Sequence, residues 1–144
     1  VQAQILNLLA DLRERRHLAL IIVSHDLSVV RHMTDRAIVM YGGRIVERAT
    51  TAQIFEAPRH PYTRILIDSV PERVGEARMV VNENVPVESE GCVFARRCAF
   101  VQSDCLKRHP PLSGDARHEV SCYHPLATVQ PTLELANDRS RCWS

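Results

Sequence analysis

An uninterrupted apolar run from Leu18 to Val23 constrains the fold of this chain more than any other part of its sequence. The run stops abruptly at a hydroxyl, an imidazole and a carboxylate, which belong to Ser24, His25 and Asp26. Such a pattern is typical of a buried β-strand. In open α/β sheets, ligands bind beyond the carboxyl ends of the strands, because the strand ends open into a crevice. This triplet is therefore a candidate site.

Helical patterns flank the predicted strand on both sides. Upstream, apolar residues recur at helical spacing before a charged cluster, which predicts a helix with one buried face formed by Ile5, Leu8, Leu9 and Leu12. Downstream, the segment from Leu27 to Met33 predicts a short helix. Either Ser24 or Asp26 is suited to cap its N-terminus. The order of helix, strand and helix favours an α/β fold.

Two β-type runs joined by a diglycine come next. Residues 37–41 and 44–47 flank Gly42-Gly43, and this composition favours a tight hairpin with positive φ angles at both glycines.

Two further helices are predicted before the character of the sequence changes. Thr50 or Thr51 is suited to cap a short helix that reaches Phe55. A second helical pattern runs from Tyr62 to Val70 and is ended by Pro71.

Beyond Pro71 the apolar periodicity is weak, and all five cysteines lie there, four of them between Cys92 and Cys122. We therefore place a module boundary between residues 71 and 85. The first module covers residues 1–70 and the cysteine-bearing module covers residues 71–126. Residues 127–144 have little periodicity and are expected to form a flexible tail.

The composition is that of an ordinary soluble protein. Of its 144 residues, 45% are hydrophobic and 24% are charged, and the formal net charge is +1. These values exclude a disordered chain and a nucleic-acid-binding polycation. The longest apolar run is far shorter than the roughly 20 residues of a membrane-spanning helix, so membrane contact is expected only through a partner. The start at Val1, without Met or a signal peptide, is expected to be a cut end.

Four of the five cysteines follow the pattern Cys92-x5-Cys98-x6-Cys105-x16-Cys122. Three explanations are open: a metal or iron–sulfur site, disulfides, or inert buried thiols. Disulfides suit secreted chains, and no signal peptide is visible here. The spacing differs from the paired C-x2-C of common zinc sites. We favour metal ligation among the three.

Other residues near the cysteines have open roles. His109 and His124 are able to replace a thiolate if the metal is zinc. Cys142 fits no spacing and is predicted to be a free thiol.

The first half of the chain resembles the C-terminal third of an ABC transporter ATPase domain. The resemblance rests on the strand that ends in Ser24-His25-Asp26, the helices around it, and the segments 37–47 and 54–55. Within that superfamily, the stretch Pro58-Arg59-His60-Pro61-Tyr62-Thr63-Arg64-Ile65-Leu66 resembles the signature of the oligopeptide and dipeptide importer ATPases.

The cysteine-bearing segment resembles the C-terminal extension of the same branch, so that the resemblance covers roughly residues 1–126. It implies an α/β fold: the C-terminal part of a P-loop ABC-type ATPase domain, with strand–helix units and a β-hairpin, followed by a small irregular Cys-rich extension.

The resemblance implies that His25 is the switch-loop histidine, a catalytic residue that hydrogen-bonds the γ-phosphate of ATP and helps to orient the attacking water. An imidazole at a strand end is able to donate to a phosphate oxygen where charge accumulates during phosphoryl transfer. Ser24 and Asp26 are expected to orient His25. The alternative is that His25 is an ordinary polar residue at a helix cap. Solvated or packing roles are expected for His17, His32 and His60.

The parts of an ATP site that hold the phosphates and magnesium are absent from this sequence. A phosphate loop needs Gly-x-x-x-x-Gly-Lys-Ser/Thr, but the only lysine is Lys107 and the five glycines are not so arranged. No strand ends in Asp-Glu, and the glutamine loop and the ABC signature sequence are missing as well. We therefore interpret the chain as part of a longer ATPase, and predict that by itself it neither binds nor hydrolyses ATP.

The resemblance also implies a 4Fe–4S cluster held by the four cysteines of the extension, with zinc as the alternative. We expect the cluster to stabilise the fold rather than to transfer electrons, because the extension has too little apolar periodicity for a convincing core. Arg96 and Arg97 are suited to offset the negative charge of a cluster, or else form a solvated basic pair.

The function implied is that of an ABC importer ATPase, with ATP and Mg²⁺ as cofactors, that drives uptake of di- and oligopeptides or related small solutes such as nickel. The implied partners are a second ATPase subunit or domain, two transmembrane permease subunits and an extracytoplasmic peptide-binding protein. The location implied is the cytoplasmic face of a bacterial or archaeal cell membrane. The alternative is a non-catalytic zinc- or iron–sulfur-binding interaction module. In isolation, unpartnered apolar surface is expected to make the chain aggregation-prone.

Overall fold

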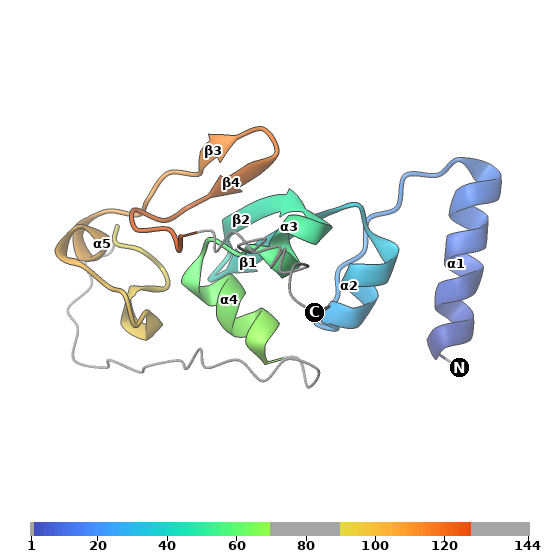
Figure 1. The fold of residues 1–144 in the computed structure, drawn as a ribbon, viewed down its shortest axis with the longest axis horizontal. Helices are drawn as coiled ribbons and strands as arrows, with labels where there is room; N and C mark the ends of the chain where they lie inside the picture. The colour runs from blue at the N-terminus through green and yellow to red at the C-terminus, as the bar shows by residue number, and fades with distance from the viewer. Residues whose placement is uncertain (1, 70–89, 128–144) are drawn as a thin grey trace, which may run out of the picture.

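The computed structural model describes residues 2–69 and 90–127, which form an elongated arrangement (Figure 1). The first half contains the helices α1 (Gln2–Arg16), α2 (Leu27–Met33), α3 (Thr51–Glu56) and α4 (Pro61–Asp68), and the strands β1 (Arg36–Tyr41) and β2 (Arg44–Thr50). The second half contains the 3₁₀ turn η1 (Ala95–Arg97), the helix α5 (Ser103–Lys107), and the strands β3 (Ser113–Asp115) and β4 (His118–Val120). None of the described helices combines the length and the apolar character that crossing a membrane requires.

The strands β1 and β2 form the predicted hairpin. Its turn is Gly42-Gly43, with φ angles of 55° and 76°, and the register pairs Tyr41 with Arg44. A two-residue turn of this kind needs positive φ at both positions, which glycine adopts without strain. The diglycine prediction is therefore confirmed.

Local capping contacts explain where the short helices begin. The Asp26 carboxylate accepts hydrogen bonds from the backbone N–H groups of Ser28 and Val29, so Asp26 is the N-cap of α2. Thr50 caps α3 through a capping box, in which Gln53 returns a side-chain contact to the Thr50 backbone. Of the alternative caps that the sequence offers, the structure selects Asp26 and Thr50.

The four strands form one antiparallel sheet in the order β1-β2-β4-β3, which joins the two halves of the chain. The register of β2 with β4 pairs Glu47 with Val120 and Ala49 with His118. The cysteine-bearing segment is thus more regular than predicted, because part of it extends the hairpin as a sheet. The predicted boundary over 71–85 lies outside the described residues, as does the tail from residue 128.

The predicted buried strand over Leu18–Val23 is wrong for this structure, in which residues 18–24 form no strand. Ile21 and Val23 are 92% and 97% exposed. A buried parallel strand needs hydrogen-bonded neighbours and helices on both faces, and residues 2–69 and 90–127 supply neither.

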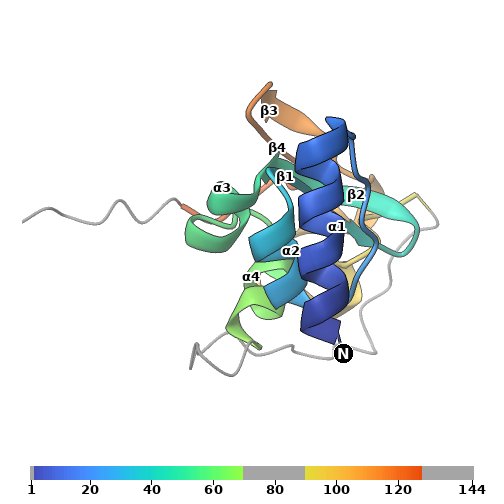
Figure 2. The same ribbon diagram turned by 90° about the vertical axis from the view of Figure 1, so that its right-hand side faces the viewer.

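The predicted buried face of α1 is also exposed, with Leu8 60% accessible and Ile5 53%. Figure 2 shows α1 standing beside α2. The two are joined by the Arg13 guanidinium, which donates to the Met33 carbonyl across 3.1 Å and pairs with Asp35. The apolar face of α1 therefore has no core to pack into within the described part of the chain.

The buried apolar residues form two small cores. The first is built by buried residues of β2, α3 and α4, namely Ala49, Ile54, Phe55 and Ile67. The second lies in the extension and is built by Cys92, Phe94, Ala95, Cys98 and Cys105. The second core contains three of the cysteines that the sequence singles out.

Candidate functional site

The structure places the triplet Ser24-His25-Asp26 at the surface, directly before α2. Ser24 and His25 are exposed, and Asp26 is half-buried. Ser24 Oγ accepts a hydrogen bond from the Asp26 backbone N–H across 2.9 Å, and the Asp26 carboxylate is used by the helix cap. Among the described residues, no hydrogen bond involves the His25 ring. The two neighbours shape the loop that carries His25 rather than contact its imidazole.

The four cysteines predicted to act together line a single pocket. We call this the cysteine pocket, and its lining includes Cys92, Cys98, Cys105, Cys122, His60, Phe94 and His124. All four are free thiols, of which the first three are buried and Cys122 is half-buried. The fold therefore brings Cys92 and Cys122, which are 30 positions apart in the sequence, into the lining of one pocket.

Backbone contacts of the extension hold the cysteines in position. The Cys92 N–H donates to the Cys105 carbonyl across 2.8 Å, which ties the start of the segment to α5. Cys98 follows η1, and its N–H donates to the Ala95 carbonyl. Cys122 follows β4 after Ser121, whose N–H donates to the Val46 carbonyl of β2 across 2.8 Å. The sheet thus positions the fourth cysteine.

Burial makes the thiolate form costly at all four cysteines. Desolvation raises the pKa of Cys92, Cys98 and Cys105, and raises that of Cys122 to about 12. Each thiolate would also repel the others, which adds to the increase in the pKa of Cys122. A bound cation reverses this balance, because a coordinating thiol is deprotonated by the metal.

An aromatic wall joins the cysteine pocket to the hairpin and α4. Phe94 packs edge-on against Tyr41 with ring centroids 5.1 Å apart, and lies 5.4 Å from Tyr62. The ring of His60 lies 5.7 Å from Phe94. The stretch that contains His60 and Tyr62 therefore supports the pocket from the first half of the chain.

The other histidines near the pocket differ in their contacts. His124 Nε2 lies 2.9 Å from a carboxylate oxygen of Asp104, and these two residues and Cys105 have their candidate ligand atoms within 4.8 Å of one another. His109 Nε2 lies 3.2 Å from Ser121 Oγ. Of the two predicted zinc alternatives, only His124 lines the pocket.

The remaining predicted residues lie elsewhere. His17 is exposed with a φ of 52°, and His32 Nδ1 lies 2.8 Å from the Ser28 carbonyl at the surface. His60 is buried and packs in the wall described above. Arg96 and Arg97 are exposed on η1. Cys142 lies outside the described residues.

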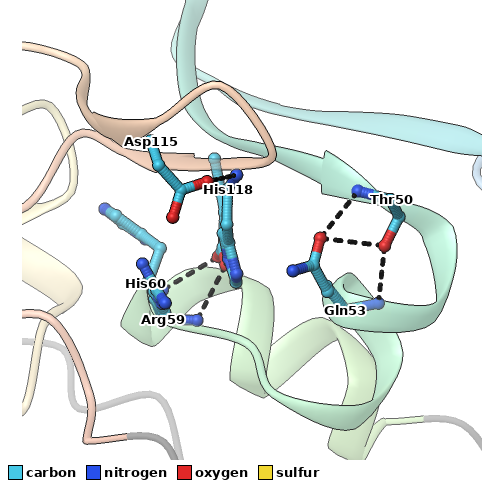
Figure 3. A network of polar contacts seen from close by, with 7 residues as sticks. Thr50, Gln53, Arg59, His60, Asp115 and His118 are labelled. Atoms are coloured by element: carbon cyan, nitrogen blue, oxygen red, sulfur yellow. Dashed lines mark hydrogen bonds and ion pairs between the residues drawn. The ribbon is translucent and has the colours of Figure 1, made fainter.

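A buried carboxylate, which sequence reasoning missed, connects the first half of the chain to the extension. Figure 3 labels its partners Arg59, His60 and His118, which come from both halves. Glu47 is fully buried and accepts hydrogen bonds from the N–H groups of Arg59 and His60 across 2.8 Å and 2.9 Å. Its third partner is His118 Nε2 at 2.7 Å. The only sequence signal is a charged residue next to the buried Val46 within a β-type run, and nothing in the sequence indicates its partners.

Comparison with known protein families gives a match for this chain. Residues 46–105 match the family described as the oligopeptide/dipeptide transporter, C-terminal region. The matched segment contains the stretch 58–66 and three of the pocket cysteines.

Similar proteins are ATP-binding proteins of peptide transport. The oligopeptide transport ATP-binding protein OppF of Escherichia coli is 40% identical over 132 residues, which cover 85% of this chain and 39% of that protein. The probable D,D-dipeptide transport ATP-binding protein DdpF of the same organism is 38% identical over 135 residues, which cover 88% of this chain and 43% of that protein. This chain therefore spans about two fifths of the length of these relatives.

Proposed function

Because this chain belongs to the family of oligopeptide/dipeptide transport ATP-binding proteins, we propose that it forms the C-terminal part of an ATP-hydrolysing subunit that drives peptide uptake. The observation that carries the proposal is the match to such proteins over 85% of the chain. The relatives favour this function over a separate metal-binding interaction module.

The exposed apolar surface of the first half supports the proposal. Ile21 and Val23 are almost fully exposed, and the apolar face of α1 is unpartnered in the described part of the chain. Apolar surface of this extent costs free energy in water and is suited to pack against further strands and helices. The larger ATPase domain that the relatives possess would supply such a surface.

His25 is proposed to contact the γ-phosphate of ATP. It is exposed at the end of the apolar segment, and Ser24 and Asp26 fix the turn that carries it. An imidazole N–H placed against a γ-phosphate oxygen stabilises the charge that develops there as the terminal bond breaks. ATP and Mg²⁺ would be held chiefly by residues of the larger domain, since this sequence has no phosphate loop.

The proposed partners follow from the same family. They are a second ATPase subunit or domain, two membrane-spanning permease subunits and a peptide-binding protein outside the membrane, and the proposed location is the cytoplasmic face of the membrane. The proposed cargo is a di- or oligopeptide or a small solute such as nickel.

We also propose that the cysteine pocket holds a 4Fe–4S cluster, with zinc as the alternative metal. The donor set fits this group, because four free thiols line one pocket whose remaining lining is largely apolar or aromatic. A cluster bound there would supply an inorganic core that crosslinks the separate turns of the extension. The chain's own contribution is to orient the sulfur atoms and to exclude water through Phe94 and the neighbouring tyrosines.

Joining this chain to the upstream part of the E. coli oligopeptide transport ATP-binding protein should test the proposed function. We expect the joined protein to show Mg²⁺-dependent ATP turnover and the 144-residue chain alone to show none, because the phosphate loop comes from the upstream part. Phosphate release is the measurement. Turnover by the isolated chain, or a folded joined protein that binds ATP without turnover, would contradict the proposal.

A further inference from the structure

We propose that His60 donates a hydrogen bond from Nε2 to a sulfur atom of the metal group held in the cysteine pocket. The inference rests on the proposed metal centre and gives a role to the histidine of the stretch 58–66. It differs from the ligand assignment, because His60 does not coordinate the metal.

The contacts of His60 fix the position of its proton. The Tyr62 backbone N–H donates to His60 Nδ1 across 3.1 Å at the start of α4. A ring nitrogen that accepts a hydrogen bond carries a lone pair, so the proton of the neutral ring is on Nε2. Burial lowers the pKa of His60 to about 4, which keeps the ring neutral at physiological pH. His60 therefore presents a single donor, Nε2–H.

The donor belongs to a ring that lies almost entirely inside the protein. His60 is only 1% exposed, and the hydrogen bond of its ring within residues 2–69 and 90–127 is the one at Nδ1. An N–H group in such a place gains free energy when it pairs with a buried acceptor. The ring lines the same pocket as the four cysteines. The acceptor that the geometry offers is therefore a sulfur atom of whatever the cysteines bind.

The histidine is also held rigidly. Its backbone N–H donates to Glu47 Oε2 across 2.9 Å, and Pro61 restricts the chain immediately after it. Its ring packs against Phe94 at 5.7 Å. The backbone and the ring of His60 are thus both held before any metal arrives, which lowers the entropic cost of forming the hydrogen bond.

A donor at this place has an electrostatic consequence. Four thiolates bring negative charge into a buried pocket, and the nearby Arg96 and Arg97 are exposed. A hydrogen bond to a sulfur atom stabilises that charge and raises the reduction potential of an iron–sulfur cluster. His60 would therefore tune the centre without being a ligand.

The test compares three full 144-residue chains loaded anaerobically with ferrous iron and sulfide: the wild type, His60→Asn and Phe94→Leu. Asparagine keeps an oxygen that caps α4 but is too short to place a donor where Nε2 lies. We expect His60→Asn to take up as much iron and sulfide as the wild type, with a more negative midpoint potential. We also expect it to lose part of the shift in Fe–S stretching frequencies that deuterium exchange causes. Phe94→Leu alters the packing beside His60 but removes no donor, so it should keep that shift.

A loaded His60→Asn chain with an unchanged potential and an unchanged deuterium shift would overturn the inference. If the His60→Asn chain takes up no iron and sulfide, a second measurement replaces it. This measurement is pulsed electron paramagnetic resonance of the reduced His124→Gln chain, prepared with ¹⁵N-labelled histidine. A weakly coupled imidazole nitrogen supports His60 as the donor, and its absence overturns it. A wild-type chain that takes up no iron and sulfide overturns the proposed cluster itself, and the inference with it.

Discussion

Loading the cysteine pocket is expected to raise the melting temperature of the chain strongly, and Cys98→Ser is expected to abolish both the loading and the rise. Cys98 lies in the pocket with the other three thiols, and serine preserves its size while removing the sulfur donor. A ligand bound only by the folded state adds about 4 kcal/mol at a thousandfold excess over Kd. Since 1 kcal/mol shifts Tm by about 4–8 °C in domains of 60–100 residues and by about 2–4 °C in domains of 150–250 residues, we expect a rise of about 10–30 °C.

The matched control is Cys142→Ser, which replaces the one cysteine outside the predicted pattern. We expect it to load and to melt like the wild type. Thermal melting followed by circular dichroism, with metal and sulfide analysis of the same samples, provides the measurement. Equal melting of loaded and unloaded wild-type chains would mean that the pocket has no stabilising metal.

Glu47→Ala should destabilise the described fold by about 3–5 kcal/mol, because it leaves buried donors without their acceptor. Arg59 N–H, His60 N–H and His118 Nε2 all donate to this carboxylate, so the turn before α4 and the strand β4 lose their common partner. The loss also weakens the attachment of β4 to β2, and with it the position of Cys122 in the pocket. Denaturant unfolding and amide exchange at Arg59 and His60 are the measurements.

Glu119→Gln is a suitable control for Glu47→Ala. Glu119 pairs with Arg48 across the same two strands, but Arg48 is partly exposed. Such a pair contributes less than about 1 kcal/mol. If Glu47→Ala costs no more than Glu119→Gln, the buried carboxylate does not organise the junction.

Features that depend on local chemistry were predictable from the sequence. The diglycine fixes the hairpin turn because glycine alone adopts both positive φ angles without strain. Asp26 and Thr50 cap their helices through contacts two or three residues away, which sequence spacing reveals directly.

Features that depend on distant partners were not predictable. The run Leu18–Val23 has the composition of a buried strand, but a strand forms only where neighbours accept its backbone hydrogen bonds. Within the described ranges those neighbours are missing, and Val23 is left exposed. The burial of Glu47 was not predicted either, because a glutamate in a strand is usually solvated and here it is completely buried.

The candidate site was partly predictable. The spacing of Cys92, Cys98, Cys105 and Cys122 indicated a common site, and in the structure all four line one pocket. Nothing in the sequence indicated that His60 lines the same pocket, because its position there depends on the sheet and on Glu47.

The most direct test of the proposed function is the ATP turnover of the joined protein carrying His25→Ala, measured beside His32→Ala. His32 is an exposed histidine of α2 whose ring hydrogen-bonds the Ser28 carbonyl of its own helix, so its loss should leave turnover unchanged. Loss of a donor to the developing charge should lower kcat by about 10²–10³, with ATP binding retained. Equal turnover in the His25→Ala and His32→Ala proteins would contradict the assignment of His25 to the γ-phosphate.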